Sequence, residues 1–243
     1  SYYGMKAILF TFMTEYLVNS VGDKAVVQSN IANQWIHLFG MGVYLFPLIG
    51  AIISDIWWGK YKTIILLSIV YCVGHLALAL DETRTGFLLG LTMIAIGSGG
   101  IKPCVSAHVG DQFDSSNFDL LDKIFSFFYL SINIGAAISM LLTPYFLSKF
   151  GPSVAFGVPG LLMIIATILF FFGRNTFTQI EPTKDPRNYF KEIIEMLPIL
   201  KTLGLIYLFI SVFWSLFDQT GSSFIKQANT ELMIKKLNIF DYS

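Results

Sequence analysis

The chain has 243 residues, of which 54% are hydrophobic and only 13% are charged, and its mean hydropathy is +0.65. Soluble domains carry about 25% charged residues, so this composition indicates an integral membrane protein with several spans. The formal net charge is zero, which gives no indication of a nucleic-acid partner. The cysteines Cys72 and Cys104 both lie within apolar runs, so a disulfide framework is not expected.

Seven apolar segments follow one another along the chain, each near the ~20 residues that a membrane-spanning helix requires. The alternation in units of about ten residues that is typical of a transmembrane β-barrel is not seen in this sequence. The predicted fold class is therefore all-α integral membrane. The predicted spans are residues 1–20, 33–57, 63–80, 87–108, 124–147, 153–173 and 203–225.

The first segment opens with two tyrosines and a lysine, Tyr2, Tyr3 and Lys6. An intramembrane lysine beside tyrosine hydroxyls can bind an anionic group such as a carboxylate. Alternatively, Lys6 extends to the membrane interface from a short helix. Because the chain begins with serine inside an apolar run, we expect residues to precede Ser1 in the complete protein.

The second segment carries His37 and Tyr44, which lie seven residues apart and therefore on one face of a helix. A histidine inside a membrane can carry a proton near neutral pH, or it can stay neutral and join two helices by a hydrogen bond. The sequence leaves both interpretations of His37 open.

The second segment ends in a stretch rich in glycine and charge, Gly50–Thr63, in which Gly59 and Lys60 form a tight turn. It resembles the cytoplasmic loop motif of the major facilitator superfamily, in which an aspartate acts at a helix–helix contact that locks one conformation. The resemblance implies gating or structural roles for Asp55, Gly59 and Lys60, and no direct contact of Asp55 with substrate.

The fourth segment contains a lysine far from both of its ends. Lys102 is ~22 Å from the start of the run and ~13 Å from its end, so it lies inside a bilayer core ~30 Å thick. A buried ammonium there costs roughly 2.5–3.5 kcal/mol or more and normally faces a polar cavity or a partner. The neighbouring Gly99, Gly100 and Pro103 are typical of a cavity wall, although a purely structural pairing of Lys102 with a carboxylate is the alternative.

The fifth and seventh segments supply the remaining polar and aromatic candidates. Tyr129 and Asn133 are four residues apart and share a helix face, and Asn133 needs a partner from another helix or a ligand. Tyr207, Trp214 and Asp218 form one stripe, which is either a packing surface or a binding surface.

Basic residues in the loops predict the orientation and the division of the chain. One side has Lys60, Lys62, Lys123, Arg174, Lys184, Arg187, Lys191 and Lys201, and the other has Lys24, Arg84 and Lys149. The positive-inside rule makes the first side cytoplasmic, together with the N-terminus. The polar, proline-containing stretch 174–202 with an amphipathic segment divides a six-helix unit, 1–173, from 203–243, which we expect to hold the seventh helix and an extracellular segment of an incomplete second bundle.

No metal-ligand spacing, nucleophile motif or phosphate-binding glycine loop stands out in the sequence. The polar residues are distributed over five predicted helices, which suits a translocation path better than a catalytic centre. We therefore expect a membrane transporter that is not an enzyme, needs no cofactor beyond protons as coupling ion, and is surrounded by the lipid bilayer.

These stretches together resemble the proton-coupled oligopeptide transporter family of the major facilitator superfamily, on its animal-type side. The matching stretches are SYYGMKAIL from Ser1, YLFPLIGAIISDIWWGKYKT from Tyr44, GSGGIKPCVS from Gly97, GDQF from Gly110, FSFFYLSINIG from Phe125 and FWSLFDQTG from Phe213. The resemblance implies the N-terminal six-helix bundle of that fold plus the first helix of its second half, in a plasma-membrane carrier.

The resemblance also implies roles for individual residues. Proton coupling would involve His37 and Lys102, with di- and tripeptides and protons as the transported partners, and Asp218 would act structurally or in gating. The implied substrate-binding residues are Tyr2, Tyr3, Lys6, Tyr44, Lys102, Tyr129, Asn133 and Trp214.

The chain departs from the family pattern at three places. The Glu-x-x-Glu-Arg motif that would immediately precede Ser1 is absent, Lys6 stands where arginine is usual, and Thr202 stands where animal members carry arginine. A lysine keeps the charge of an arginine but loses its bidentate geometry. Two alternative functions stay open: a carrier of nitrate or another small anion on the same scaffold, and a receptor or scaffold without transport.

Overall fold

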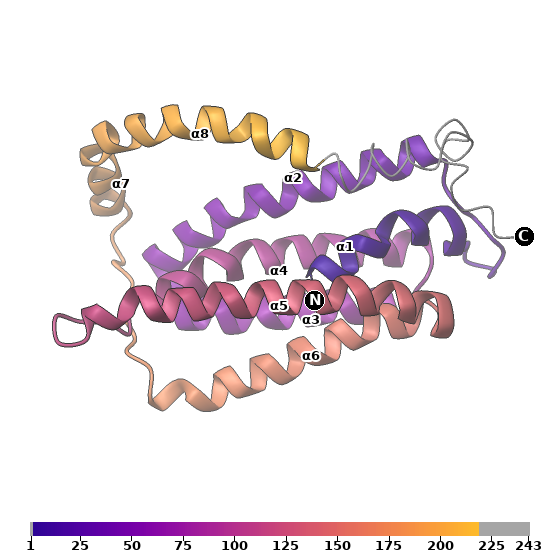
Figure 1. Cartoon of the computed structure of the whole chain (residues 1–243), viewed down its shortest axis with the longest axis horizontal. Helices are drawn as coiled ribbons and strands as arrows, with labels where there is room; N and C mark the ends of the chain where they lie inside the picture. Colours follow the sequence, from indigo (N-terminus) through magenta and orange to yellow (C-terminus); the bar gives the residue numbers. More distant parts are fainter. Residues whose placement is uncertain (1, 219–243) are drawn as a thin grey trace, which may run out of the picture. The chain divides into compact units, whose positions relative to one another are not determined.

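The structure, a computed structural model, describes residues 2–218, and these form helices joined by short loops (Figure 1). Two units divide at Pro186, the first spanning residues 1–186 and the second beginning at Arg187. The labelled helices are α1 (Tyr2–Thr11), α2 (Ser29–Ile53), α3 (Lys60–Leu80), α4 (Arg84–Gly110), α5 (Leu121–Phe150), α6 (Pro152–Phe172), α7 (Pro186–Glu195) and α8 (Leu197–Asp218).

Six helices within the described residues are long and apolar enough to cross a membrane, which confirms the all-α membrane fold class. They correspond to the predicted spans from the second to the seventh, and each of the five within the first unit begins before its predicted start. The seventh is described only to Asp218, so residues 219–225 of that predicted span lie outside the described residues.

The first predicted span is the one whose helix ends before the predicted residue and gives way to extended chain. The helix covers Tyr2–Thr11 and a π-helical turn, Phe12–Tyr16, instead of continuing to residue 20. The turn closes when the Leu17 N–H donates to the Phe12 carbonyl, 3.1 Å away and five residues back. The chain is then extended, and the Val18 N–H donates to the Glu82 carbonyl of the α3–α4 loop.

The α2–α3 turn is built in a similar way. After α2, a second π-helical turn, Ser54–Trp58, ends when the Gly59 N–H donates to the Ser54 carbonyl at 2.8 Å. Gly59 has φ 77°, in the left-handed region that glycine adopts without steric cost, and α3 begins at the next residue. The glycine predicted to form this tight turn therefore makes the reversal from α2 to α3.

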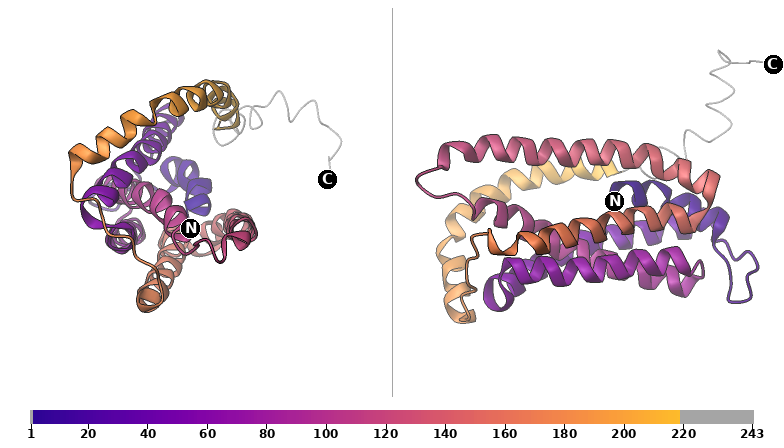
Figure 2. Two further views of the ribbon diagram at one scale, coloured as in Figure 1. Left: turned by 90° about the vertical axis from the view of Figure 1, so that its left-hand side faces the viewer. Right: turned by 90° about the horizontal axis from the view of Figure 1, so that it is seen from below.

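Helices α2 to α6 run side by side and alternate in direction (Figures 1 and 2). The packed neighbours include α2 with α4, α3 with α4 and α6, and α5 with α1 and α6. Close crossings depend on small residues, because a Cβ at Gly50 of α2 would clash with the backbone of Gly100 in α4. At the α3–α4 crossing, a Cβ at Gly74 would lie 2.9 Å from the Gly90 carbonyl oxygen.

An aromatic cluster lies where α1, α4 and α6 approach one another. Phe12 is fully buried, and its ring centroid is 5.2 Å from those of both Phe87 and Phe156, which are equally buried. His75 of α3 is also fully buried, and its Nδ1 donates to the Phe156 carbonyl at 3.1 Å. His75 therefore joins α3 to α6, as expected for a structural histidine.

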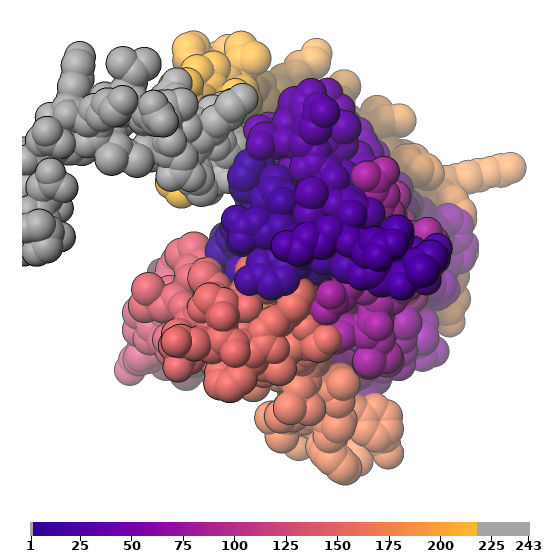
Figure 3. All heavy atoms as spheres, turned by 90° about the vertical axis from the view of Figure 1, so that its right-hand side faces the viewer, coloured from indigo at the N-terminus to yellow at the C-terminus, as the bar shows by residue number. Residues whose placement is uncertain are grey.

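The two ends of the first unit differ in how many Lys and Arg residues lie at them: Lys60, Lys62, Lys123, Arg174 and Lys184 at one end, and Lys24, Arg84 and Lys149 at the other. One end, called the basic end below, contains the α2–α3 turn, the α4–α5 loop 111–120 and the segment 173–185 that follows α6. At the opposite end, the segment 17–28 lies near the α5–α6 turn (Figure 3), and Arg84 donates to the Ala25 carbonyl at 3.3 Å. The loops grouped as cytoplasmic from the sequence thus lie at the same end of the first unit.

Candidate functional site

Lys102 emerges from the second half of α4 on a side that the first unit leaves exposed. Its ammonium lies 4.2 Å from the centroid of the Tyr2 ring in the first turn of α1. A cation over the face of an aromatic ring is attracted by the ring quadrupole, by roughly 0.5–2 kcal/mol depending on solvation. The contact fixes the lysine head group beside α1.

The surroundings of Tyr2 orient its ring. Tyr2 stacks on Phe39 of α2 with centroids 6.1 Å apart, and it meets Tyr3 edge to face at 5.4 Å. Phe39 is only 7% exposed, so it holds the Tyr2 ring against the bundle core. Tyr3 itself is 48% exposed.

Lys6 lies one helical turn after Tyr2 and is half-buried. Its charge acts on the ammonium of Lys102, so the two cations lie close enough to repel each other. Two neighbouring ammonium groups beside tyrosine rings form a positively charged corner, hereafter the Lys6–Lys102 corner. Such a corner favours an anion, because an anion relieves the repulsion and accepts hydrogen bonds from both lysines.

His37 and Tyr44 both lie on the exposed surface of α2, where Tyr44 is 62% exposed. Their seven-residue spacing places them on one face of this helix, as the sequence predicted. Neither is part of the buried core, so both are accessible from outside the first unit.

The fifth helix supplies Tyr129 and Asn133, both exposed. The Asn133 side-chain amide donates to the Tyr129 carbonyl of its own helix at 2.9 Å, and the expectation that another helix or a ligand supplies a further partner stays a prediction. An exposed helical position allows this local bond, because no other helix of the first unit covers that part of α5. Tyr129 packs edge to face on Phe128 at 5.6 Å.

The second unit contains the remaining predicted site residues. Trp214 of α8 is 48% exposed and meets Phe213 and Phe217 edge to face, at 5.6 and 5.3 Å. Asp218 ends α8, and its side chain lies outside the described part of the structure. The role of this stripe, packing or binding, stays a prediction.

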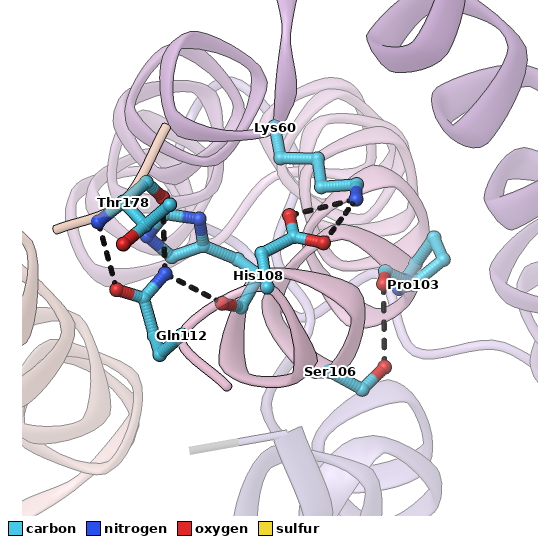
Figure 4. A network of polar contacts seen from close by, with 7 residues as sticks. Lys60, Pro103, Ser106, His108, Gln112 and Thr178 are labelled. Carbon is cyan, nitrogen blue, oxygen red and sulfur yellow. Dashed lines mark hydrogen bonds and ion pairs between the residues drawn. The ribbon is translucent and has the colours of Figure 1, made fainter. Parts of the chain in front are cut away.

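Three of the four predicted gating or structural residues, Asp55, Gly59 and Lys60, lie at the basic end, where Lys60 contacts Asp111, a residue that the sequence analysis missed (Figure 4). The Lys60 ammonium donates to both carboxylate oxygens of Asp111, at 2.8 and 2.7 Å. Asp111 directly follows α4, within the GDQF stretch. The sequence around this aspartate does not indicate that it pairs with Lys60. The Asp55 backbone carbonyl accepts a hydrogen bond from the Thr183 N–H at 2.9 Å.

The segment after α6 is attached to this end by side chain and backbone together. The Gln112 amide donates to the Thr178 carbonyl at 3.0 Å and accepts from the Thr178 N–H at 2.9 Å (Figure 4). The Lys184 N–H donates to the Ile56 carbonyl at 2.9 Å. The first part of the predicted linker 174–202 thus belongs to the first unit, where it is bonded to the α2–α3 turn and the α4–α5 loop.

Among residues 2–218, no group of three or more His, Cys, Asp and Glu side chains is arranged to hold a metal ion. The arrangement of the site is instead a set of cations, aromatic rings and hydroxyls on α1, α2, α4 and α5. Such a set can hold a small ligand that carries a negative charge, but it contains no assembled nucleophile and base.

Comparison with known proteins places the chain among membrane transporters. A sequence model described as POT family (PTR2) matches residues 61–203, more than half of the chain. Solute carrier family 15 member 2 of Danio rerio is 37% identical over 94% of the chain, and Peptide transporter family 1 of Drosophila melanogaster is 38% identical over 94%. The chain spans 37% and 36% of the length of these two curated relatives.

Solved structures agree in fold. The POT family transporter PepTSo has a TM-score of 0.70 and 46% identity, over 76% of this chain and 37% of that one. A mutant peptide transporter POT in complex with alafosfalin has a TM-score of 0.68 and 26% identity, over 85% of this chain and 43% of that one. The helical arrangement of the first unit is therefore one that POT transporters share.

Proposed function

The chain belongs to the POT family of transporters, and on that premise we propose that it forms part of a proton-coupled carrier of di- and tripeptides. It is a multi-pass membrane protein, with six spans among its described residues. Similar proteins are named as peptide transporters, and one similar structure holds alafosfalin. Membership in a transporter family also argues against a catalytic function for this chain.

The Lys6–Lys102 corner is the observation that carries the proposal. Every peptide ends in a carboxylate, whatever its side chains, so a carrier with broad peptide selectivity needs a fixed site for an anion. The Lys102 ammonium over the Tyr2 ring, with Lys6 one turn away, is such a site. Charge-assisted hydrogen bonds to a carboxylate are roughly twice as strong as neutral ones.

The other predicted residues would form the walls of the same path. Tyr44, Tyr129 and Asn133 are exposed side chains that present hydroxyl and amide groups to a peptide backbone, and Trp214 would add an aromatic surface. Apolar and aromatic walls with few polar groups accept side chains of many kinds. Asn133 would lie nearest the peptide amino terminus.

Proton coupling would depend on His37 and Lys102. A proton on His37 and a carboxylate beside Lys102 each change the charge of an exposed polar face, and so they can shift the balance between inward-open and outward-open states. The excess of basic residues at the basic end supports a cytoplasmic location for that end and for the N-terminus. We place the carrier in the plasma membrane.

A binding experiment tests the carboxylate assignment directly. Titration calorimetry of the full-length protein would compare a dipeptide with its C-terminal amide, in wild type, Lys102→Ala and Lys149→Ala. Lys149 is an exposed lysine at the far end of α5 and serves as the matched control.

We expect wild type to bind the C-terminal amide roughly tenfold or more weakly than the dipeptide, and Lys102→Ala to bind the dipeptide more weakly by a similar factor. Because both changes remove the same contact, Lys102→Ala should lose little further affinity for the amide. Lys149→Ala should bind both ligands as wild type does. Additive losses would mean that Lys102 does not contact the carboxylate. Tight binding of nitrate in place of the dipeptide would support the anion-carrier alternative, and binding without any uptake would support a receptor.

A further inference from the structure

A cavity of about 300 Å³ lies at the basic end, away from the Lys6–Lys102 corner. This volume is at the lower end of the range of small-molecule sites. Three elements enclose it: the α2–α3 turn, the last turns of α4 and the segment after α6. The lining residues are Trp57, Trp58, Gly59, Lys60, Tyr61, Lys62, His108, Gln179, Ile180, Glu181, Pro182 and Lys184.

The charges around the cavity favour an anion. Lys60, Lys62 and Lys184 line it, against a single lining carboxylate, Glu181. The charge of Lys60 is neutralised by Asp111 in the ion pair at 2.7 Å. Lys184 and Glu181 are both exposed, and their closest charged atoms are 3.9 Å apart, so this ion pair is weak. Lys62 and Lys184 are therefore the lysines whose charge can act on a ligand.

Helix α3 adds the dipole of its N-terminus. The helix is 21 residues long and begins at Lys60, and Gly59 gives its first turn no side-chain cap. No acidic side chain lies in this first turn. The first N–H groups of a helix lack intrahelical partners and carry partial positive charge, which makes this position favourable for a phosphate or another anion.

Two buried polar atoms of the lining side chains have no hydrogen-bond partner within residues 2–218. These are Nε2 of His108, a residue that is only 5% exposed, and the buried hydroxyl of Tyr61. An unpaired buried polar atom is destabilising, so such atoms normally have a role. Both side chains belong to the cavity lining.

The positions of these two side chains are fixed by packing. Tyr61 stacks on Phe170 with centroids 5.4 Å apart, and the His108 ring meets Phe170 and Phe177 edge to face at 5.6 and 5.3 Å. The wall formed by the segment after α6 is equally fixed, since Thr183 and Lys184 donate backbone hydrogen bonds to the turn. The cavity is therefore formed before any ligand enters.

We propose that this cavity binds a phosphate group through Lys62, Lys184, the first turn of α3, Tyr61 and His108. A phosphate presents several oxygens, which can accept from the lysines, the helix N–H groups and the tyrosine hydroxyl at once. Trp57 and Trp58 are 53% and 42% exposed beside the cavity, as in the aromatic belt of a membrane interface. The phosphate can belong to a lipid headgroup or be free in the cytoplasm.

The test measures phosphate binding by the full-length protein from both sources. Thermal unfolding is recorded in detergent with inorganic phosphate at constant ionic strength, and in nanodiscs of phosphatidylcholine with and without phosphatidic acid. Wild type is compared with the double variant Lys62→Gln/Lys184→Gln. The matched control is Lys123→Gln/Arg174→Gln, which removes two exposed charges at the same end from residues outside the cavity lining.

We expect at least one phosphate source to raise the melting temperature of wild type and of the control, with a dissociation constant about tenfold weaker in the cavity variant. A response to phosphatidic acid alone identifies a lipid headgroup, and a response to inorganic phosphate alone identifies a soluble ligand. His108→Phe keeps the aromatic packing and removes both ring nitrogens. It should therefore weaken phosphate binding, and without phosphate its melting temperature should not fall below that of wild type.

Two results would overturn the proposal. In the first, neither phosphate source would change the melting temperature of wild type. In the second, the control double variant would lose as much affinity as the cavity variant. The second result would mean that the anion responds to the general surface charge of the basic end.

Discussion

The ion pair between Lys60 and Asp111 gives the sharpest prediction about how the helix ends are held together. It joins the start of α3 to the end of α4, with the Lys60 ammonium 2.8 and 2.7 Å from the two carboxylate oxygens. The side chains are only 22% and 12% exposed, so solvent screens the pair less than a surface pair. We consider Lys60→Gln, Asp111→Asn and the double variant.

The magnitude follows from charge separation and burial. Two unit charges about 3 Å apart attract by roughly 5 kcal/mol at an effective dielectric constant of ~20, and the desolvation of both groups offsets most of this. We expect a net coupling of about 1–3 kcal/mol. Each single variant should therefore lower the melting temperature by about 3–10 °C, since 1 kcal/mol corresponds to about 2–4 °C in a domain of this size.

The assay is thermal unfolding in detergent, followed by tryptophan fluorescence, as a double-variant cycle. Removing one partner leaves the other charge half-buried, so either single variant should be destabilised more than half as much as the double variant. Losses from the two single variants that add up in the double variant, within about 0.5 kcal/mol, would refute the reasoning, because the two side chains would then act independently.

Three further predictions concern stability in the same assay. Gly59→Ala should cost about 1–2 kcal/mol, because φ 77° is unfavourable for a residue with a Cβ, whereas an alanine placed in open space at Gly110 should be neutral. Gly50→Val should lower the melting temperature by more than Gly59→Ala, because its side chain meets the backbone of Gly100, and an unchanged value would contradict the close crossing of α2 and α4. Burial raises the pKa of Glu82, so the folded state holds its proton more tightly than the unfolded state; stability is highest at low pH and falls as pH rises from the ordinary carboxyl pKa to the raised one. Glu82→Gln should remove that part of the pH dependence, and a profile identical to wild type would contradict it.

The long helices could be predicted from composition because a bilayer requires about 20 apolar residues for each span. Their ends could not be predicted as well, since helices continue past the apolar run into polar residues. Helix α4 begins at Arg84, three residues before the predicted start, with the Thr83 hydroxyl accepting from the Gly86 N–H. The early end of α1 depends on hydrogen bonds to the distant α3–α4 loop, and no local residue signals it.

The candidate site could be predicted as a set of residues but not as a set of contacts. Polar residues in apolar helices identify Lys6 and Lys102, because burying a charge in a membrane is costly without a function. Their approach to Tyr2 depends on how α1 packs against its neighbours, which a sequence pattern does not determine. Asn133 also makes a local bond that the sequence analysis did not predict, from its side-chain amide to the Tyr129 carbonyl of its own helix.

Asp111 was missed because its importance arises from a partner 51 positions away. The polar composition of the segment after α6 predicted a linker, yet residues 178, 183 and 184 bond to the α4–α5 loop and the α2–α3 turn largely through backbone groups, which composition does not reveal. Side-chain patterns identify spans and buried charges, whereas backbone hydrogen bonds between distant loops become visible only in three dimensions.

The central claim is that Lys102 belongs to a proton-driven peptide carrier, and one measurement tests it most directly. Uptake of a labelled dipeptide would be followed in vesicles containing the full-length protein, with and without an inward proton gradient, for wild type, Lys102→Ala and the control Lys149→Ala. We expect accumulation that requires the gradient, is lost in Lys102→Ala and is unchanged in Lys149→Ala. Absence of dipeptide uptake at any gradient, with intact protein in the membrane, would contradict the peptide-carrier account.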